Sequence, residues 1–198
     1  RVIDAKTMKA TEYFAKVIFL NAAALNSNLI LLNSISSRFP NGLGNDSGTL
    51  GKYVAFHNYR SRVSGKYDGY LDKTTDGRSP TSGYIPRFRN VEKQETDFLR
   101  GYAAGFYAGR GSHTNTDGFG ESLKENLGKS ELGPWHVGSH MMGETIPKES
   151  NYVTLDKEKK DAWGMPLLSI SVDYDTNDDK MVKDFQEQLI DMFEKAGF

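Results

Sequence analysis

Aromatic-rich segments with the composition of β-strands fill the middle of the chain and constrain its fold more than any other feature. The first three read YVAFHNYRSRVSG, GYIPRFRNV and DFLRGYAAGFYAG, and clusters of Gly, Asp, Pro and Ser separate them. Aromatic and β-branched residues fit a pleated, half-buried surface, and such clusters are typical of the turns between strands. Three more apolar segments follow, PWHVGSHMMGE, NYVTLD and PLLSISVDYD. The spacing predicts an antiparallel sheet of about six strands.

Two amphipathic patterns predict helices at either side of these segments. The sequence TNDDKMVKDFQEQLIDMFEKAG has Asn177 or Thr176 as a helix cap, acids in the first turn, and Gly197 as the end of the helix. GFGESLKENLGKSELG favours a further short helix. The apolar faces consist of Leu25, Leu29, Leu32 and Ile35 in the first helix, and of Met181, Phe185, Leu189, Met192 and Phe193 in the last. Helices on one face of an antiparallel sheet predict an α+β fold.

The N-terminal segment KVIFLNAAALNSNLILLNS has the pattern of a nucleotide-binding crossover, in which a strand leads through a turn into a helix. Residues 2–5 and 12–20 are apolar enough to form two strands of a hairpin. In dinucleotide sites the turn is rich in glycine, because the backbone must approach a pyrophosphate at the helix N-terminus. Here the turn is Asn21, Ala22, Ala23 and Ala24. The pattern is therefore accidental, or it marks a secondary contact of a cofactor site whose main phosphate loop lies elsewhere.

Composition excludes several classes of function. The formal charge of the 198 residues is −1, so the chain has no general electrostatic attraction to nucleic acid or anionic membranes. The absence of cysteine excludes disulfides, thiolate catalysis and cysteine zinc sites. No apolar run approaches the roughly 20 residues of a membrane span, and no secretory leader is present. We expect a soluble chain, in a cytoplasmic or periplasmic compartment that the composition does not define, and a piece of a longer protein.

His136 and His140 are spaced as two zinc ligands on a helix would be. Trp135, Val137, Ser139 and Met141 alternate around them as in a strand. Residues four apart in a strand lie about 13 Å from each other, at about 3.3 Å per residue. We therefore predict no metal site, and two histidines on one face of the sheet.

Arginines are interleaved with aromatic residues in two of the predicted strands. Such a pattern is found on platforms for single-stranded nucleic acid, but the near-neutral charge argues against that function. The arginines are solvated or paired with acids, or they frame a polar ligand to which guanidinium groups donate paired hydrogen bonds. The residues concerned are Arg87, Arg89 and Arg100, among Tyr84, Phe88, Phe98 and Tyr102.

Glycines recur on one face of the segment FLRGYAAGFYAGRG, at Gly101, Gly105 and Gly109. Glycine weakens a strand and is tolerated where a backbone or a ligand comes close, and close packing of a helix is the more common cause. The chain has no G-x-S-x-G elbow, no Walker loop, no H-E-x-x-H and no Rossmann G-x-G-x-x-G. It therefore carries no self-contained catalytic motif.

Taken together, the segments resemble the glucose-methanol-choline (GMC) family of FAD-dependent oxidoreductases. VIDAKTMKATEYFAKVIFLNAAALNSNLILLNS resembles the family's hairpin, strand, A-A-G-A and S-x-x-L-L-L-x-S run. FPNGLGNDSGTLGKYVAFH is similar to F-P-x-G-L-x-N-S-S-G-x-L-G-R-x-L-M-D-H. The similarity continues through GYIPRFRN, FLRGYAAGFYAG, VTLDKEKKDAWGMPLLSI and NDDKMVKDF to MFEKAGF. It covers nearly the whole chain.

The resemblance implies that residues 1–52 are a strip of the FAD-binding domain and residues 53–198 the substrate-binding domain of an enzyme that oxidises CH–OH groups of sugars or other alcohols. Asn21, Ala22 and Ala23 then lie at a secondary FAD contact. The family's phosphate loop lies N-terminal to this sequence, and its catalytic His and His or Asn partner lie C-terminal to it. The isolated chain is therefore expected to be inactive and to bind FAD weakly or not at all. Its partners would be the substrate and the remaining FAD-domain segments.

Strand alternation predicts which residues shape the substrate site. A sheet packed under helices on one face should keep its charged residues and imidazoles on the other. We therefore expect Arg87, Arg89, Arg100, Tyr102 and His140 to border the open face, and His57 to be structural. The alternative is a free-standing module that binds carbohydrate or a partner without catalysis. A flanking G-x-G-x-x-G upstream and an H-x-x-G-x-x-x-M-G-type segment downstream would distinguish the enzyme from this module.

Overall fold

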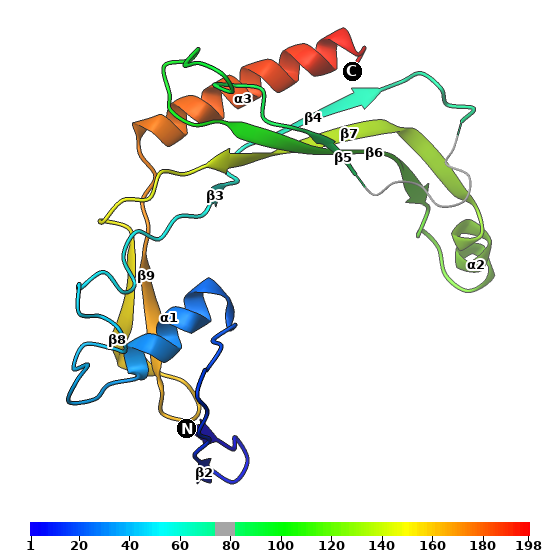
Figure 1. Ribbon diagram of the computed structural model, residues 1–198. Helices are drawn as coiled ribbons and strands as arrows, with labels where there is room; N and C mark the ends of the chain where they lie inside the picture. Colours follow the sequence, from blue (N-terminus) through cyan, green and yellow to red (C-terminus); the bar gives the residue numbers. More distant parts are fainter. Residues whose placement is uncertain (74–81) are drawn as a thin grey trace. The chain divides into compact units, whose positions relative to one another are not determined.

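The computed structural model describes residues 1–73 and 82–198 and has an α+β fold with antiparallel sheets (Figure 1). The chain forms two compact units. The first unit is Arg1–Ala55 with Pro147–Asp173, and the second unit is Phe56–Ile146 with Tyr174–Phe198. The sequence predicts a domain boundary between residues 52 and 53; in the structure the first compact unit extends to Ala55 and also includes Pro147–Asp173. No helix in the described residues is long and apolar enough to span a membrane.

The second unit is built on a five-stranded antiparallel sheet. Its centre is the long pair β6 and β7, and the connection between them contains the short helix α2. Strands β3 and β4 pair with β7, and β5 pairs with β6. The bounds are β3 His57–Asn58, β4 Arg62–Tyr67, β5 Gly83–Ile85, β6 Tyr102–Thr114, α2 Glu121–Leu127 and β7 Ser130–Glu144. About six strands in one sheet were expected, and five are present among the described residues. The last two predicted strands pair with each other in the first unit, and the first predicted segment forms two strands, β3 and β4, instead of one.

Helix α3, Thr176–Lys195, covers one face of this sheet. Its apolar stripe of Met181, Phe185 and Leu189 is fully buried, as the 3.6-residue spacing predicts. The N-cap is Asp175 rather than Asn177 or Thr176, since the Asp175 carboxylate accepts from two backbone N–H groups of the first turn. Gly197 has a φ of +88° directly after the helix, so its expected role at the C-terminus is confirmed. The sheet residues under the helix include Val63, Tyr102, Ala104 and Met141.

The first unit contains the remaining elements. Strands β1 and β2 form a short antiparallel hairpin, and β8 and β9 form a second one. The predicted helix is confirmed as α1. The bounds are β1 Val2–Ile3, β2 Ala10–Thr11, α1 Ala23–Asn33, β8 Tyr152–Lys160 and β9 Pro166–Ser171. Ile35 lies beyond the end of α1.

The predicted strand over residues 12–20 is wrong, because strand structure ends at Thr11. A strand needs neighbouring backbone to pair its N–H and C=O groups, and the described residues offer it none. The side chains of this segment are consequently exposed, with Phe14 at 89% and Phe19 at 83% of their full accessibility.

Candidate functional site: the open face of the sheet

The strand register of the second unit assigns each residue of the sheet to one of two faces. Residues that pair directly across strands share a face, and successive residues alternate. Tyr102, Ala104 and Met141 lie on the face that α3 covers. The opposite face, called the open face below, therefore carries the residues between them. It consists of His57, Arg62, Ser64, Lys66, Tyr84, Ala103, Gly105, Tyr107, His136, Gly138, His140, Met142 and Glu144.

Aromatic rings dominate the open face. Tyr84 and Tyr107 are 61% and 55% exposed, a large fraction for tyrosines on a sheet. His140 stacks on Tyr59, with ring centroids 6.0 Å apart and an interplanar angle of 27°. His57 in turn meets Tyr59 edge to face at 5.6 Å. These rings offer flat, partly apolar contact area at a low cost in conformational entropy.

Two glycines of the open face make room for these rings. A Cβ atom on Gly105 would lie 2.4 Å from the ring of His140, and one on Gly138 would lie 2.5 Å from the ring of Tyr107. The rings of His140 and Tyr107 therefore lie against the sheet, directly over the backbone of these glycines. Helix packing, expected as the more common reason for glycines in this strand, is not the cause at Gly105, since α3 packs on the other face.

Polar groups stand beside the rings. Arg62 is directly opposite His140, Lys66 is opposite His136, and Ser64 lies between them. At one end of β7, the Glu144 carboxylate accepts a hydrogen bond of 2.7 Å from Nη1 of Arg87. Aromatic faces next to hydrogen-bonding groups suit a hydroxylated organic ligand, because the rings contact its C–H surface while the polar groups bind its hydroxyls.

His140 is a residue predicted from sequence that does lie on the open face, together with His136. Arg87 is at the edge: its guanidinium donates to Glu144 and to the backbone carbonyls of Arg89 and Asn90. Arg100 is exposed and has a φ of +69° before β6 begins. The expected alternation through Arg87 and Arg89 is wrong because β5 ends at Ile85.

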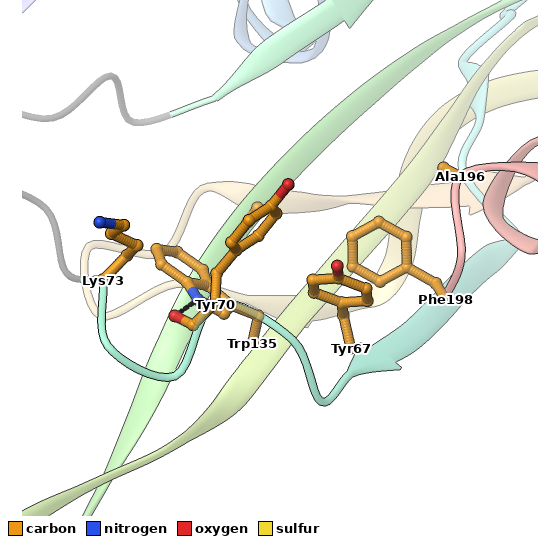
Figure 2. A pocket seen from close by; sticks show the side chains of 7 residues that line it. Tyr67, Tyr70, Lys73, Trp135, Ala196 and Phe198 are labelled. Carbon is orange, nitrogen blue, oxygen red and sulfur yellow. Dashed lines mark hydrogen bonds between the residues drawn. The ribbon is translucent and has the colours of Figure 1, made fainter.

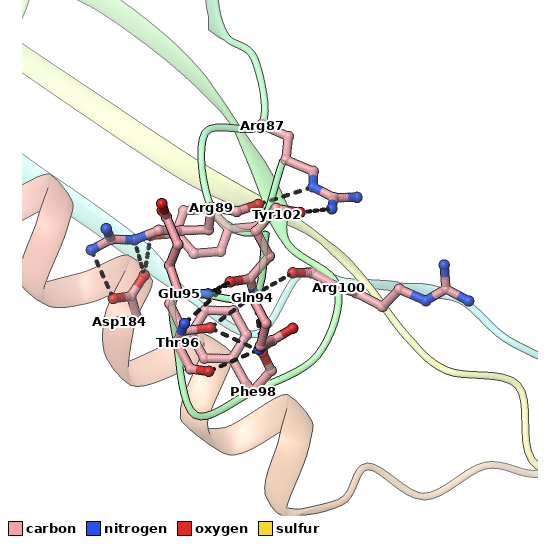
Figure 3. A network of polar contacts seen from close by, with 10 residues as sticks. Arg87, Arg89, Gln94, Glu95, Thr96, Phe98, Arg100, Tyr102 and Asp184 are labelled. Atoms are coloured by element: carbon pink, nitrogen blue, oxygen red, sulfur yellow. Dashed lines mark hydrogen bonds and ion pairs between the residues drawn. The ribbon is translucent and has the colours of Figure 1, made fainter. Parts of the chain in front are cut away.

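Arg89 and Tyr102 were expected on the open face, and that placement is wrong (Figure 3). Tyr102 is 1% exposed and packs edge to face on Phe185 of α3 at 5.4 Å. Its hydroxyl donates to Oδ2 of Asp184 at 2.6 Å, and Arg89 donates to both oxygens of the same carboxylate at 3.0 Å. The Arg89 guanidinium and the neutral Tyr102 phenol thus both donate to an acid of the helix. The rule that sheets keep charged residues on the open face does not foresee this arrangement.

Burial sets the electrostatics of this network. Burial above all, and then the Asp184 carboxylate, raises the pKa of Tyr102, so the phenol stays protonated. The hydrogen bonds to Asp184 raise the pKa of Arg89. A protonated phenol and a guanidinium that share one carboxylate hold the loop before β6 against α3. This function is structural.

The loop that carries Arg87 and Arg89 is fixed by Asn90. Its amide Nδ2 donates to Thr96 Oγ1 and to the carbonyls of Phe98 and Arg100, at 2.8 to 2.9 Å. Its Oδ1 accepts from the backbone N–H groups of Glu95 and Thr96. The loop closes on itself, so the direction of the arginines is set by tertiary contacts rather than by strand alternation.

The three residues predicted at a secondary cofactor contact lie where α1 begins in the first unit. Ala22 is the N-cap and offers no side-chain hydrogen bond, and Ala23 has a φ of +59°. The first turn of α1 contains no acid. Its N–H groups therefore lack a side-chain acceptor, which is compatible with a contact to an anionic group.

The described residues contain no group of three or more His, Asp or Glu side chains that could hold a metal ion. His136 and His140 lie along one face of β7, as the strand pattern predicts. Sequence reasoning missed Tyr59, Tyr84 and Tyr107. The alternation of β6 and β7 already contained the signal for Tyr107, since it shares a face with Gly105 and Gly109.

Comparison with known proteins gives one informative similarity. No family model matches the chain. The chain is 29% identical over 192 residues to 2-methyl-1,2-propanediol dehydrogenase of Mycolicibacterium austroafricanum, and the similarity covers 89% of this chain. The chain spans 33% of the length of that dehydrogenase. It is thus similar to one segment of an oxidoreductase.

Proposed function

We propose that this chain forms the substrate-binding part of an FAD-dependent oxidoreductase of the GMC type, which oxidises CH–OH groups of alcohols or sugars. The observation that carries the proposal is the similarity to a dehydrogenase along 89% of the chain. The sequence motifs quoted above favour the GMC type. The open face supports the same conclusion, because its rings and hydrogen-bonding groups suit a hydroxylated substrate.

In this proposal the chain's residues bind and orient the substrate. Tyr84 and Tyr107 contact its C–H surface and exclude water, while His140 and Arg62 donate hydrogen bonds to its hydroxyls. Arg87 holds Glu144 at one end of the face, and Arg100 extends from the loop nearby. When bound, FAD would supply the acceptor for the hydride. The group that takes the hydroxyl proton belongs, by resemblance, to a segment C-terminal to this sequence.

The residues of this chain fit a secondary contact with FAD and no more. The uncapped start of α1 at Ala22 and Ala23 leaves backbone N–H groups for an anion, but the glycine-rich loop that would bind most of the pyrophosphate is absent from the sequence. Equilibrium dialysis of the isolated chain should therefore find no stoichiometric yellow complex at micromolar FAD. Such a complex would mean that this chain contains the main FAD-binding site, contrary to the proposal.

The exposed segment around Phe14 and Phe19 favours the enzyme over a free-standing binding module. Exposed apolar side chains in consecutive positions, in a segment with strand composition, mark a surface that another part of a protein covers. A module that functions by itself would have little reason to keep them.

The flanking coding sequence provides the first test, since the proposal requires G-x-G-x-x-G upstream and an H-x-x-G-x-x-x-M-G-type segment downstream. Without these two motifs the proposal fails. The second test is dye-coupled oxidation of a panel of alcohols and aldoses by the protein with its flanking segments. Tyr84→Ala and His140→Ala should raise KM several-fold without loss of flavin, whereas Lys183→Ala on the exposed side of α3 should behave as wild type. Unchanged kinetics in both open-face variants would contradict the assignment of the site.

A further inference from the structure

A second site lies at the far end of the sheet, on the face that α3 covers and past the C-terminus of that helix. It is a cavity of about 570 Å³ in the second unit, called the aromatic cradle below (Figure 2). Its lining residues are Tyr67, Tyr70, Lys73, Ala108, Trp135, Ala196 and Phe198. Tyr67 and Trp135 are directly opposite each other on β4 and β7. The small side chain of Ala108 on β6 leaves space beside them.

One wall of the aromatic cradle is held by an unusual set of hydrogen bonds to carbonyl oxygens. Arg110 donates from Nη1 to the carbonyls of Leu71 and Lys73, both at 2.8 Å. The same guanidinium donates from Nε to Gly133 at 2.7 Å. The indole Nε1 of Trp135 donates to the carbonyl of Tyr70 at 3.1 Å. These bonds tie the segment that carries Tyr70 and Lys73 to the sheet, so this wall is preformed.

The other wall is formed by the turn after α3. Gly197, with its φ of +88°, reverses the chain so that the N–H of Phe198 donates to the carbonyl of Phe193 at 2.9 Å. The ring of Phe198 then packs against Tyr67 at 5.6 Å and against Phe193 at 5.9 Å. Both walls of the cavity are therefore aromatic and fixed by backbone hydrogen bonds.

The chemistry of the lining selects one class of ligand. The rings of Tyr67, Tyr70 and Trp135 favour a flat ring system, which they can contact by offset or edge-to-face stacking. Among the described residues, the lining contains one charged side chain, that of Lys73. Its ammonium group forms an exposed ion pair with Asp72 at 3.1 Å, which is weak enough to be replaced by an ion pair with a ligand. The hydroxyls of Tyr67 and Tyr70 make no hydrogen bond within residues 1–73 and 82–198, so both can donate to an anion.

We propose that the aromatic cradle binds one planar aromatic carboxylate, with its rings against the aromatic lining and its carboxylate toward Lys73. The volume lies in the range of small-molecule sites and is too small for a helix or a folded partner. The cradle is on the opposite face of the sheet from the open face, so the inference is independent of the oxidoreductase function.

The two tryptophans allow a direct test by nuclear magnetic resonance. In the whole 198-residue chain, the indole N–H signal of Trp135 reports on the cradle, and that of Trp163, bonded to Ala5 in the first unit, is an internal control. Titration with 2-naphthoate should shift the Trp135 signal saturably, with a dissociation constant on the order of 1 mM or tighter. The Trp163 signal should stay in place. Equal shifts of both signals, or no saturation, would overturn the proposal.

Variants and probe analogues make the test specific. Ala108→Leu fills the space between the walls and should weaken binding by about tenfold or more. Ala103→Leu, the same substitution on the opposite face of β6, should leave the binding of 2-naphthoate unchanged. Lys73→Gln should weaken the binding of 2-naphthoate by roughly two- to fivefold. The binding of the neutral 2-naphthalenemethanol should not change. Equal binding in Ala108→Leu and wild type would reject the site, and equal affinity for the acid and the alcohol would reject the anionic class.

Discussion

The two faces of the five-stranded sheet use the same residue types for opposite purposes. On the covered face, Tyr102 is buried against Phe185 and its hydroxyl is bonded to Asp184. On the open face, Tyr84 and Tyr107 keep more than half of their surface accessible. The covered face is a core with a half-buried polar network around Asp184, whereas the open face is an accessible surface of rings and polar groups. What packs on a face of the sheet therefore determines whether a tyrosine there is buried in the core or stays accessible.

The largest effect on stability should come from shortening a buried side chain between α3 and the covered face. Phe185→Ala removes a fully buried ring between α3 and the sheet, and should lower the free energy of unfolding by about 3–5 kcal/mol. Ile190→Ala on the same helix is the matched control, because Ile190 is 46% exposed. Urea denaturation measures both variants. A similar loss in both would mean that α3 does not pack on the sheet as described.

A smaller loss is expected from the polar network. Asp184→Ala leaves the Tyr102 hydroxyl and the Arg89 guanidinium without their acceptor in a half-buried place, which should destabilise the protein by about 1–3 kcal/mol. Asp191→Ala, which breaks an exposed pair with Lys195 on the same helix, should have a much smaller effect. The double variant Tyr102→Phe, Asp184→Ala should lose less free energy of unfolding than the sum of the two single variants, because both substitutions remove the same hydrogen bond. If the losses in the two single variants added up to the loss in the double variant, Tyr102 and Asp184 would not interact.

Asp178 is expected to make the stability of the second unit depend on pH. This residue is 2% exposed, and one of its carboxylate oxygens has no hydrogen-bond partner among residues 1–73 and 82–198. Burial is the main cause that raises its pKa. The protonated form is favoured in the folded state, so its contribution to stability is full below the ordinary pKa of an aspartate and is lost as pH rises through the raised value.

Asp178→Asn should remove this dependence while keeping an oxygen that accepts from the N–H of Asp175. The free energy of unfolding of wild type relative to the variant should therefore decrease between pH 4 and pH 7. A series of denaturation curves across that range measures it. A relative stability that increases with pH would mean that the carboxylate is stabilised when ionised.

The smallest effects on stability should come from the open face. Tyr84→Ala and Tyr107→Ala remove exposed rings and should change the free energy of unfolding by less than about 0.5 kcal/mol each. Gly138→Ala should move the Tyr107 ring off the sheet at little expense in stability, because its new Cβ meets the far end of that side chain. Thermal unfolding of the three variants checks this. A loss comparable with that of Phe185→Ala would show that the open face is part of the core.

Local patterns in the sequence are enough to predict several elements of the fold. The apolar spacing of α3, the helix end at Gly197, the antiparallel α+β class and the shared face of His136 and His140 all follow from the periods of 3.6 and 2 residues. Resemblance to a family of oxidoreductases was also available from sequence motifs alone. These features require no knowledge of what lies opposite in space.

Which face of the sheet is covered, and which strands pair, depends on contacts between segments that are distant in the sequence. Alternation separates Tyr102 from Tyr107 but does not say which of the two meets α3. Arg89 reaches Asp184, almost a hundred positions away in the chain, because the loop around Asn90 folds back onto the helix. The segment of Phe14 and Phe19 has the composition of a strand but forms none, since a strand exists only where another backbone pairs with it. Contacts between distant segments are not encoded in local periodicity, and the site depends on them.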